Sequence, residues 1–283
     1  MARAWPLLRS IATGVLLSAL VVLMGSLIAG QTGMLDRHYI FFPSKDILET
    51  PADYGLAFED VTLEAADGTR LHGWFIPGGP GTTWVWFHGN GGNVAGRLDE
   101  LAAFHRMLDA SIFIFDYRGY GRSEGTPSEA GLYLDAEAAL AYLRSRNGVD
   151  ASRIVLYGRS LGSAVAVEMA AKHDVAGVAL EAPFTSIKAM ARKSYPFIPA
   201  WLLVKSRFDT LSKMPDVKAP LLVLHSDMDE LIPIDMGRQV YDAAGGPKRF
   251  VVLEGAAHND PHPEGDAVFF SAMREFLNSL ENE

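Results

Sequence analysis

Apolar and polar residues alternate from about Tyr54 onward in blocks that are typical of strands and helices. Short apolar runs that end in glycine or polar residues indicate strands buried on both faces, as parallel sheets require. The predicted strands lie at 82–89, 111–119, 153–158, 175–184, 220–226 and 248–255, and the predicted helices at 93–110, 126–146, 163–173, 234–244 and 267–280. This alternation predicts an α/β sheet that is flanked by helices on both sides.

Two segments depart from the alternation. Residues 58–78 read as two strands around the turn sequence ADGT, which is a hairpin signal. Between Phe184 and Ala219 the strand–helix rhythm stops, and prolines and aromatic residues appear instead. We expect a small helical cap insertion at 184–219. The alternative is an ordinary irregular connection.

The N-terminal segment is more apolar than the rest of the chain. After Arg3 and Arg9, no residue from 10 to 35 is charged. A span of about 20 apolar residues crosses a bilayer as a helix. We therefore predict a signal-anchor transmembrane helix within residues 1–36. The folded domain, 37–283, is then expected on the non-cytoplasmic (periplasmic or extracellular) side by the positive-inside rule. A cleaved signal peptide, which would give a secreted protein, and a buried core helix are the alternatives.

Composition narrows the choice of function. The net charge of −9 and the lack of a Lys/Arg-rich patch argue against a nucleic-acid partner. The chain has no cysteine, which excludes disulfides, thiolate metal sites and cysteine nucleophiles.

The sequence GRSLG, Gly158 to Gly162, places a serine between two glycines. The pattern G-x-S-x-G is weak evidence alone, but here a predicted strand precedes it and a predicted helix follows it. That context is typical of a serine nucleophile on a sharp strand-to-helix turn. We predict Ser160 as the nucleophile, with a simple glycine turn as the alternative.

A serine hydroxyl needs a base to take its proton and a carboxylate to orient the base. In α/β folds with a serine on such a turn, the three residues occur along the chain in the order serine, acid, histidine. The predicted strand at 220–226 is followed by Asp227, Asp229 and Glu230, and the strand at 248–255 by His258 and His262. We predict His258 as the base, since it lies closer to its strand, and Asp229 as the acid. Asp227 and Glu230 remain rival acids.

The sequence HGNGGN, residues 88–93, also closes a predicted strand. Glycines let backbone N–H groups approach a ligand closely, and an oxyanion needs two such donors. We predict the backbone amides of Asn90 and Leu161 as these donors. A phosphate-binding loop is the alternative, but no phosphate-loop or dinucleotide-binding motif is present.

Five motifs carry a resemblance to a known family: WFHGNGGN, FDYRGYGRSEGTPSE, YGRSLGSAVA, HSDMDELIP and GAAHND. The chain from Tyr39 onward resembles the BEM46-like branch of the α/β-hydrolase superfamily. The resemblance implies a mostly parallel eight-stranded sheet, a triad of Ser160, Asp229 and His258, and acyl transfer without metal or cofactor. Family members often have glycine where this chain has Ser226.

The second motif contains further polar residues beside the expected site. We interpret Asp116, Arg118 and Gly119 as structural supports of the loop rather than as catalysts.

Together these features predict a membrane-anchored serine hydrolase of the carboxylesterase, lipase or acyl-thioesterase type. The expected partners are a small-molecule or lipid-like acyl substrate and the membrane itself. A serine peptidase, aminopeptidase-like, on the same fold is the second reading. A catalytically silent binding protein is the third.

Overall fold

The computed structural model describes residues 25, 33–79, 81–259 and 267–281. Its main sheet contains β2 (Glu59–Glu64), β3 (Arg70–Ile76), β4 (Thr83–Phe87), β6 (Ser111–Phe115), β7 (Ile154–Arg159), β8 (Gly177–Glu181), β9 (Leu221–Ser226) and β10 (Lys248–Leu253). The strand order is β10-β9-β8-β7-β4-β6-β3-β2, and only β3 runs against the others. The prediction of a mostly parallel eight-stranded sheet is confirmed, as is the hairpin at 58–78. A small sheet of β1 (Phe42–Pro43) and β5 (Gly91–Gly92) was not predicted.

The central strands are buried on both faces because their residues are almost all apolar. Every residue of β4, β7 and β8 is buried. In the parallel pairing of β4 with β7, Phe87 lies opposite Gly158. The two strands therefore end side by side, and the HGNGGN loop leaves the sheet next to the GRSLG turn.

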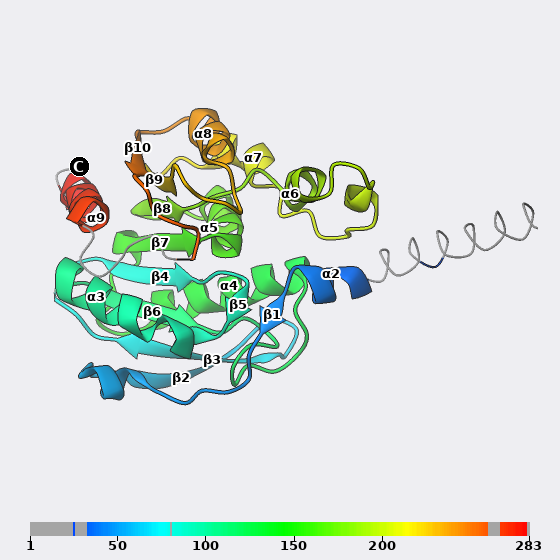
Figure 1. The fold of residues 1–283 in the computed structure, drawn as a ribbon. Coiled ribbons are helices and arrows are strands. Elements are labelled where there is room, and N and C mark those ends of the chain that lie inside the picture. Colours follow the sequence, from blue (N-terminus) through cyan, green and yellow to red (C-terminus); the bar gives the residue numbers. More distant parts are fainter. Residues whose placement is uncertain (1–24, 26–32, 80, 260–266, 282–283) are drawn as a thin grey trace, which may run out of the picture.

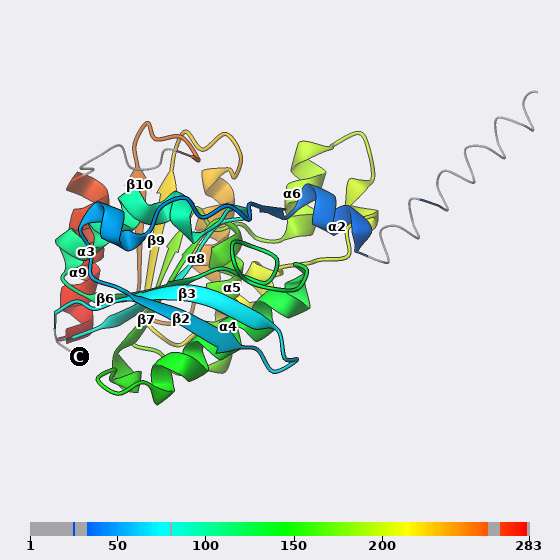
Figure 2. The same ribbon diagram turned by 90° about the horizontal axis from the view of Figure 1, so that it is seen from below.

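Helices cover both faces of the sheet (Figures 1 and 2). The larger ones are α3 (Leu98–Leu108), α4 (Glu129–Ser145), α5 (Leu161–Lys172), α8 (Ile234–Ala243) and α9 (Ala267–Glu281), and the 3₁₀ turns of the body are η1 (Pro51–Tyr54), η2 (Val94–Arg97) and η3 (Ala151–Arg153). One apolar core joins α4, α5 and α8 to the sheet, and a second joins α3 and α9 to the other face.

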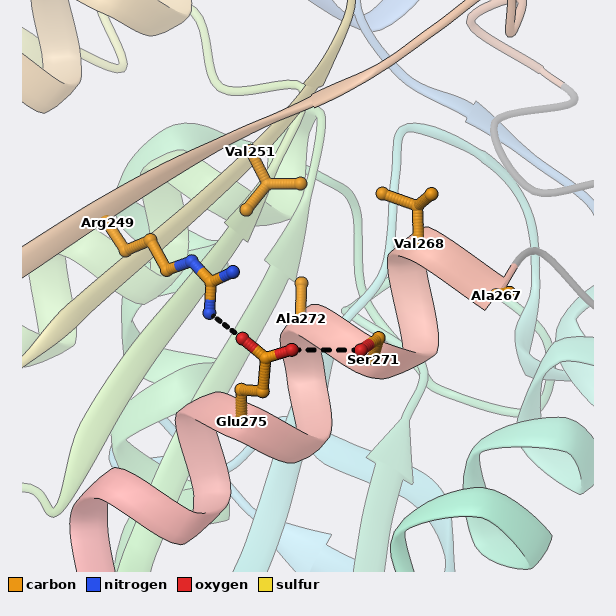
Figure 3. Close-up of a pocket in the computed structure, with 7 residues that line it drawn as sticks. All are labelled: Arg249, Val251, Ala267, Val268, Ser271, Ala272 and Glu275. Atoms are coloured by element: carbon orange, nitrogen blue, oxygen red, sulfur yellow. Dashed lines mark hydrogen bonds and ion pairs between the residues drawn. The ribbon is translucent and has the colours of Figure 1, made fainter.

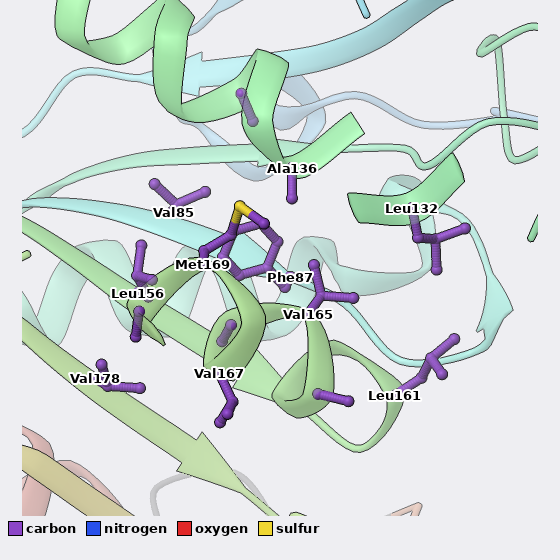
Figure 4. Close-up of a cluster of buried hydrophobic side chains, with 14 of the residues drawn as sticks. Val85, Phe87, Leu132, Ala136, Leu156, Leu161, Val165, Val167, Met169 and Val178 are labelled. Carbon is purple, nitrogen blue, oxygen red and sulfur yellow. The ribbon is translucent and has the colours of Figure 1, made fainter. Parts of the chain in front are cut away.

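Helix α5 lies at the centre of the first core. Figure 4 shows Val165 and Met169 of α5 among Phe87 of β4 and Ala136 of α4, all in the same buried cluster. Almost every residue of α5 is buried. Since a buried helix cannot shift without opening this core, the turn at its N-terminus is held in a defined position.

The cap insertion contains α6 (Ile187–Ser194), η4 (Ala200–Leu202), α7 (Thr210–Lys213) and η5 (Met214–Asp216). Its two halves differ. In the second half, Phe208 and Met214 are fully buried and belong to the first core. In the first half, every residue from 192 to 199 is exposed. The segment is helical, as expected, but only its first half stands away from the body.

Helix α2 (Met34–Tyr39) precedes β1 and lies near the cap (Figures 1 and 2). Within the part of the chain that the structure describes, no helix has the length and apolar character needed to cross a membrane. The predicted span, residues 10–35, lies almost entirely outside the described residues. It therefore stays a prediction.

Candidate active site

Ser160 occupies a strained turn between β7 and α5. Its backbone has φ 52° and ψ −116°, a conformation that residues other than glycine rarely adopt. The amide of Ser160 donates to the carbonyl of Glu181 at 2.9 Å, and the amide of Ser163 donates to the carbonyl of Ser160 at 2.9 Å. These bonds hold the turn in place. Such strain is found where the surrounding structure fixes a functional residue, so it supports the prediction for Ser160.

The two glycines of GRSLG are required by close backbone contacts. A Cβ at Gly158 would lie 2.4 Å from the carbonyl oxygen of Gly162, and a Cβ at Gly162 would lie 1.8 Å from that of Phe87. Neither contact is possible for a real side chain. Helix α5 can therefore begin directly against the end of β4 only because both positions are glycine.

The HGNGGN loop lies beside the serine. A Cβ on Gly89 would be 3.8 Å from the Cβ of Ser160. Asn90 is held by three bonds: its side-chain amide donates to the Ile40 carbonyl at 2.9 Å, and its own carbonyl accepts from the Phe42 amide at 2.9 Å and the Tyr120 hydroxyl at 2.7 Å. Small strands β1 and β5 thus fix this loop.

Within the described ranges, neither the amide of Asn90 nor that of Leu161, both near Ser160, donates a hydrogen bond. Leu161 is the first residue of α5, where the helix dipole favours negative charge. Unpaired N–H groups at such positions are what an oxyanion hole requires. Their role as oxyanion donors stays a prediction.

Asp229 and His258 are brought together. The His258 Nδ1 and Asp229 Oδ2 atoms are 2.7 Å apart, and both side chains are buried. The other carboxylate oxygen of Asp229 accepts from the amides of Leu231 at 2.9 Å and Ile232 at 2.6 Å. An ionised carboxylate only accepts, so Nδ1 carries the proton and Nε2 is left with its lone pair.

The environment keeps Asp229 ionised. Burial alone would raise its pKa, but the hydrogen bonds from His258 and from the Ile232 amide outweigh burial, and the net pKa lies below the ordinary value. A carboxylate that is ionised at neutral pH can orient an imidazole and stabilise its charged form.

The rival acids have other partners. Asp227 accepts from the Gly255 amide at 2.8 Å, and Glu230 accepts from the His258 amide at 3.0 Å. Both accept from the backbone of residues 254–259 after β10, which we call the histidine loop, and neither is hydrogen-bonded to the imidazole. His262 lies outside the described residues. Ser226, the last residue of β9, donates to the Ala256 carbonyl and so ties the loop at 227–233, which we call the acid loop, to the histidine loop.

Ser160 itself makes no side-chain hydrogen bond to His258 within the described part of the chain. The connection between the two is made by Arg159, which precedes the serine. Its guanidinium donates to the His258 carbonyl at 3.1 Å and to Glu100 at 2.6 Å, and its Nε lies 3.1 Å from Glu181. The serine turn and the histidine loop are thus fastened to one buried cation.

Arg159 was missed by the sequence analysis. Burial alone would lower its pKa, but the carboxylates of Glu181 and Glu100 outweigh burial and raise it. The Tyr157 hydroxyl also donates to Glu181. A signal was available, because an arginine inside an otherwise apolar turn requires buried partners. Its partners could not be found from spacing, since they lie on other elements.

A second missed residue is His225, at the end of β9. It is fully buried, and its Nε2 donates to the Ile232 carbonyl at 2.9 Å. Burial lowers its pKa, so the ring stays neutral. The same nitrogen lies 3.8 Å from Asp229 Oδ2. His225 therefore holds the loop after β9 through the Ile232 carbonyl.

The loop after β6 has the structural contacts that were expected of it. Asp116 accepts from the Val94 amide at 2.9 Å, Arg118 forms an ion pair with Asp135 at 2.7 Å, and Gly119 has a φ of 84°. Burial raises the pKa of Asp116 to about 7 and lowers that of the neighbouring His88 to about 3.

A pocket away from Ser160 lacks a serine–histidine–acid arrangement. It lies between β10 and α9, where Arg249 pairs with Glu275 and Ser271 donates to the same carboxylate at 2.9 Å (Figure 3). Both charged side chains are half exposed. In the ranges that the structure describes, no group of three His, Asp or Glu side chains is placed to bind a metal ion.

Comparison with known proteins places the chain among α/β hydrolases. Residues 80–213 match the family described as serine aminopeptidase, S33. The α/β hydrolase domain-containing protein WAV2 of Arabidopsis thaliana is 36% identical and covers 85% of each chain. Protein bem46 of Schizosaccharomyces pombe is 32% identical over 83% of this chain and 81% of its own.

Solved structures share the fold. An esterase of Pyrococcus furiosus, Pf2001, superimposes with a TM-score of 0.71 over 84% of this chain and 98% of its own, at 23% identity. An acetyl xylan esterase from Paenibacillus sp. R4 does so with a TM-score of 0.62 over 90% and 93%, also at 23% identity. At this identity the likeness shows the fold alone.

Proposed function

This chain belongs to the BEM46-like branch of the α/β-hydrolase superfamily, and we propose that it is a serine hydrolase that cleaves carboxylic ester or thioester bonds. The observation that carries the proposal is the pairing of a serine on a strained turn with a buried Asp229–His258 hydrogen bond, fastened to the same turn by Arg159. In the proposed triad, Ser160 is the nucleophile, His258 the base and Asp229 the orienting acid.

The proposed reaction follows from these positions. Ser160 Oγ attacks the carbonyl carbon of the substrate while His258 Nε2 takes the hydroxyl proton. The oxyanion that forms accepts hydrogen bonds from the amides of Leu161 and Asn90. The bond to the leaving alcohol or thiol breaks, and His258 returns the proton to that group.

Water completes the cycle. His258 takes a proton from a water molecule, whose oxygen attacks the acyl carbon. The bond to Ser160 Oγ then breaks, the serine regains its proton from His258 and the carboxylic acid leaves. Asp229 stays ionised and stabilises the imidazolium in both steps, in agreement with its lowered pKa.

The esterase assignment is supported by the two structural relatives, since the Pyrococcus furiosus protein and the Paenibacillus protein are both esterases. The family match favours a second candidate, a serine aminopeptidase. The same triad can cleave either bond, so the leaving group distinguishes them. A panel of p-nitrophenyl esters, acyl thioesters and aminoacyl-anilides measures this directly. Turnover of the anilides alone would assign a peptidase instead.

The nucleophile is tested by a fluorophosphonate probe. Wild-type protein is expected to be labelled covalently, and Ser160→Ala is expected to be unlabelled with an unchanged thermal transition. Ser145→Ala is the control, because Ser145 lies on α4 and its hydroxyl donates to the Tyr142 carbonyl of the same helix. Labelling that persists in Ser160→Ala would contradict the assignment, and so would equal loss in both variants.

For the N-terminal segment we propose the signal anchor that the sequence predicts. The uncharged stretch at 10–35 follows two arginines, which supports a helix with the domain on the non-cytoplasmic side. The full chain is expected to stay with membranes during carbonate extraction, and protease added outside spheroplasts should cut the domain. A soluble product that begins near Gly30 would show a cleaved signal peptide.

A further inference from the structure

The first half of the cap carries an unusual group of exposed apolar side chains. Tyr195, Phe197, Ile198 and Leu202 are exposed by 48%, 97%, 56% and 61%. Single exposed apolar residues are common on soluble proteins, but a contiguous group marks an interaction surface. We call residues 192–202 the cap tip.

The charge of this segment is opposite to that of the protein. From residue 182 to residue 208 the chain has no aspartate or glutamate, whereas the whole chain has a net charge of −9. Five basic residues fall in the same stretch: Lys188, Arg192, Lys193, Lys205 and Arg207. The combination of aromatic and aliphatic side chains with lysine and arginine is typical of surfaces that bind anionic lipid.

Two basic side chains of the cap tip contact neighbouring groups. The Arg192 guanidinium lies 5.2 Å from the centre of the Trp201 ring, which joins α6 to η4. Lys193 Nζ donates to the Leu231 carbonyl at 3.3 Å and so links the tip to the acid loop. Phe197 lies on the connection between the two helical turns and is almost fully exposed.

The cap is fastened to the helix that follows the predicted membrane span. The buried carboxylate of Asp36, in α2, accepts from the amides of Lys205 at 3.0 Å and Ser206 at 2.6 Å. Figures 1 and 2 both show α2 beside the cap. The predicted span, 10–35, ends within α2. A chain anchored by that span therefore has its cap close to the bilayer surface.

We propose that the cap tip docks into the interfacial layer of an anionic lipid bilayer, with Phe197 and Ile198 among the acyl chains and the basic residues at the headgroups. This is a contact in addition to the N-terminal anchor, and it does not depend on the hydrolase activity. Docking would place the acid loop, through Lys193 and Leu231, next to the lipid surface.

The absence of cysteine makes a direct test possible. Phe197→Cys in the full chain gives one labelling site for an environment-sensitive NBD dye. Asn147→Cys is the matched control, because Asn147 is exposed and lies on the loop before β7. That loop is at the amino ends of the parallel strands, whereas the cap follows the carboxyl end of β8. Both proteins are reconstituted in vesicles of phosphatidylcholine with phosphatidylglycerol, and quenching by aqueous iodide is measured.

Docking predicts a blue-shifted emission and several-fold weaker iodide quenching at 197 than at 147. Because both labels are on the same anchored chain, the difference measures the cap and not the anchor. Arg192→Glu with Lys193→Glu is expected to restore most of the quenching at 197. Equal quenching at the two positions would overturn the proposal. Protection at 197 that persists in detergent and falls on dilution would also overturn it, in favour of a second copy of this chain.

Discussion

The acid loop follows the carboxyl end of β9, and the cap tip follows that of the neighbouring strand β8. The two segments differ in how far their side chains are buried and bonded. In the acid loop, Asp229 is buried and each of its oxygens is hydrogen-bonded. In the cap tip, Phe197 and its neighbours are exposed. A side chain with internal partners is positioned by the fold, whereas an exposed apolar group is stabilised only by something outside it. The acid loop therefore positions a carboxylate, and the cap tip presents apolar side chains to a partner outside the chain.

The largest effect is expected at Asp229. Replacing it with asparagine favours the wrong imidazole tautomer, and an orienting carboxylate is worth roughly 10⁴ in kcat. Asp227→Asn is the control, since the Asp227 carboxylate accepts from the Gly255 amide and an amide oxygen can still accept that bond. Steady-state kinetics with the best ester substrate measures both. The reverse order of loss would identify Asp227 as the acid.

The order of elements and the positions of the candidate site residues could be predicted because each depends on local pattern. Unbroken apolar runs indicate buried parallel strands. The serine, the acid and the histidine each follow the end of such a strand, in the order that is known for this kind of site. The preference for Asp229 over its neighbours was a prediction from loop position, and the structure places its carboxylate 2.7 Å from the His258 ring.

What could not be predicted depends on contacts between distant segments. Arg159 reaches Glu100, Glu181 and His258, which come from three other elements. The strands β1 and β5 have two residues each, too few to show any periodicity. The division of the cap into a buried and an exposed half was also hidden, because Phe197 and Phe208 look alike in the sequence and differ only in what surrounds them.

The next largest effect is expected at Arg159. Arg159→Met removes the cation from buried Glu181 and from partly buried Glu100, and breaking a buried ion pair on one side costs about 3–5 kcal/mol of unfolding free energy. Arg249→Met is the control, because its pair with Glu275 is half exposed and is worth about 0–1 kcal/mol. Urea unfolding measures both variants. Similar midpoints for the two would show that Arg159 is not a structural link.

A smaller effect, dependent on pH, is expected at Asp116. Burial raises its pKa in the folded protein to about 7, from an ordinary value of 3.8. Between these values the unfolded chain loses a proton that the folded protein keeps, so this group lowers stability as pH rises towards 7. Asp116→Asn has no such proton and can still accept from the Val94 amide.

The variant should therefore gain in melting temperature relative to wild type between pH 5 and pH 8, measured by thermal unfolding at constant ionic strength. His88 faces Asp116 at 3.7 Å, and its lowered pKa acts in the opposite direction below pH 6.5. It is present in both proteins, so the difference between them isolates Asp116. A difference that does not change with pH would contradict the raised pKa.

The smallest effect on stability is expected at the most exposed apolar side chain, Phe197. Phe197→Ala should change the free energy of unfolding by less than about 0.5 kcal/mol, as is usual for exposed positions without partners. Phe208→Ala is the matched control within the same cap. Phe208 is fully buried against the rings of Phe41 and Tyr133, and truncating a buried phenylalanine costs about 3–5 kcal/mol. Urea unfolding in detergent separates folding from lipid contact. A large loss for Phe197→Ala in detergent would mean that the tip packs against protein, and the contrast between a positioned region and a contact region would then fail.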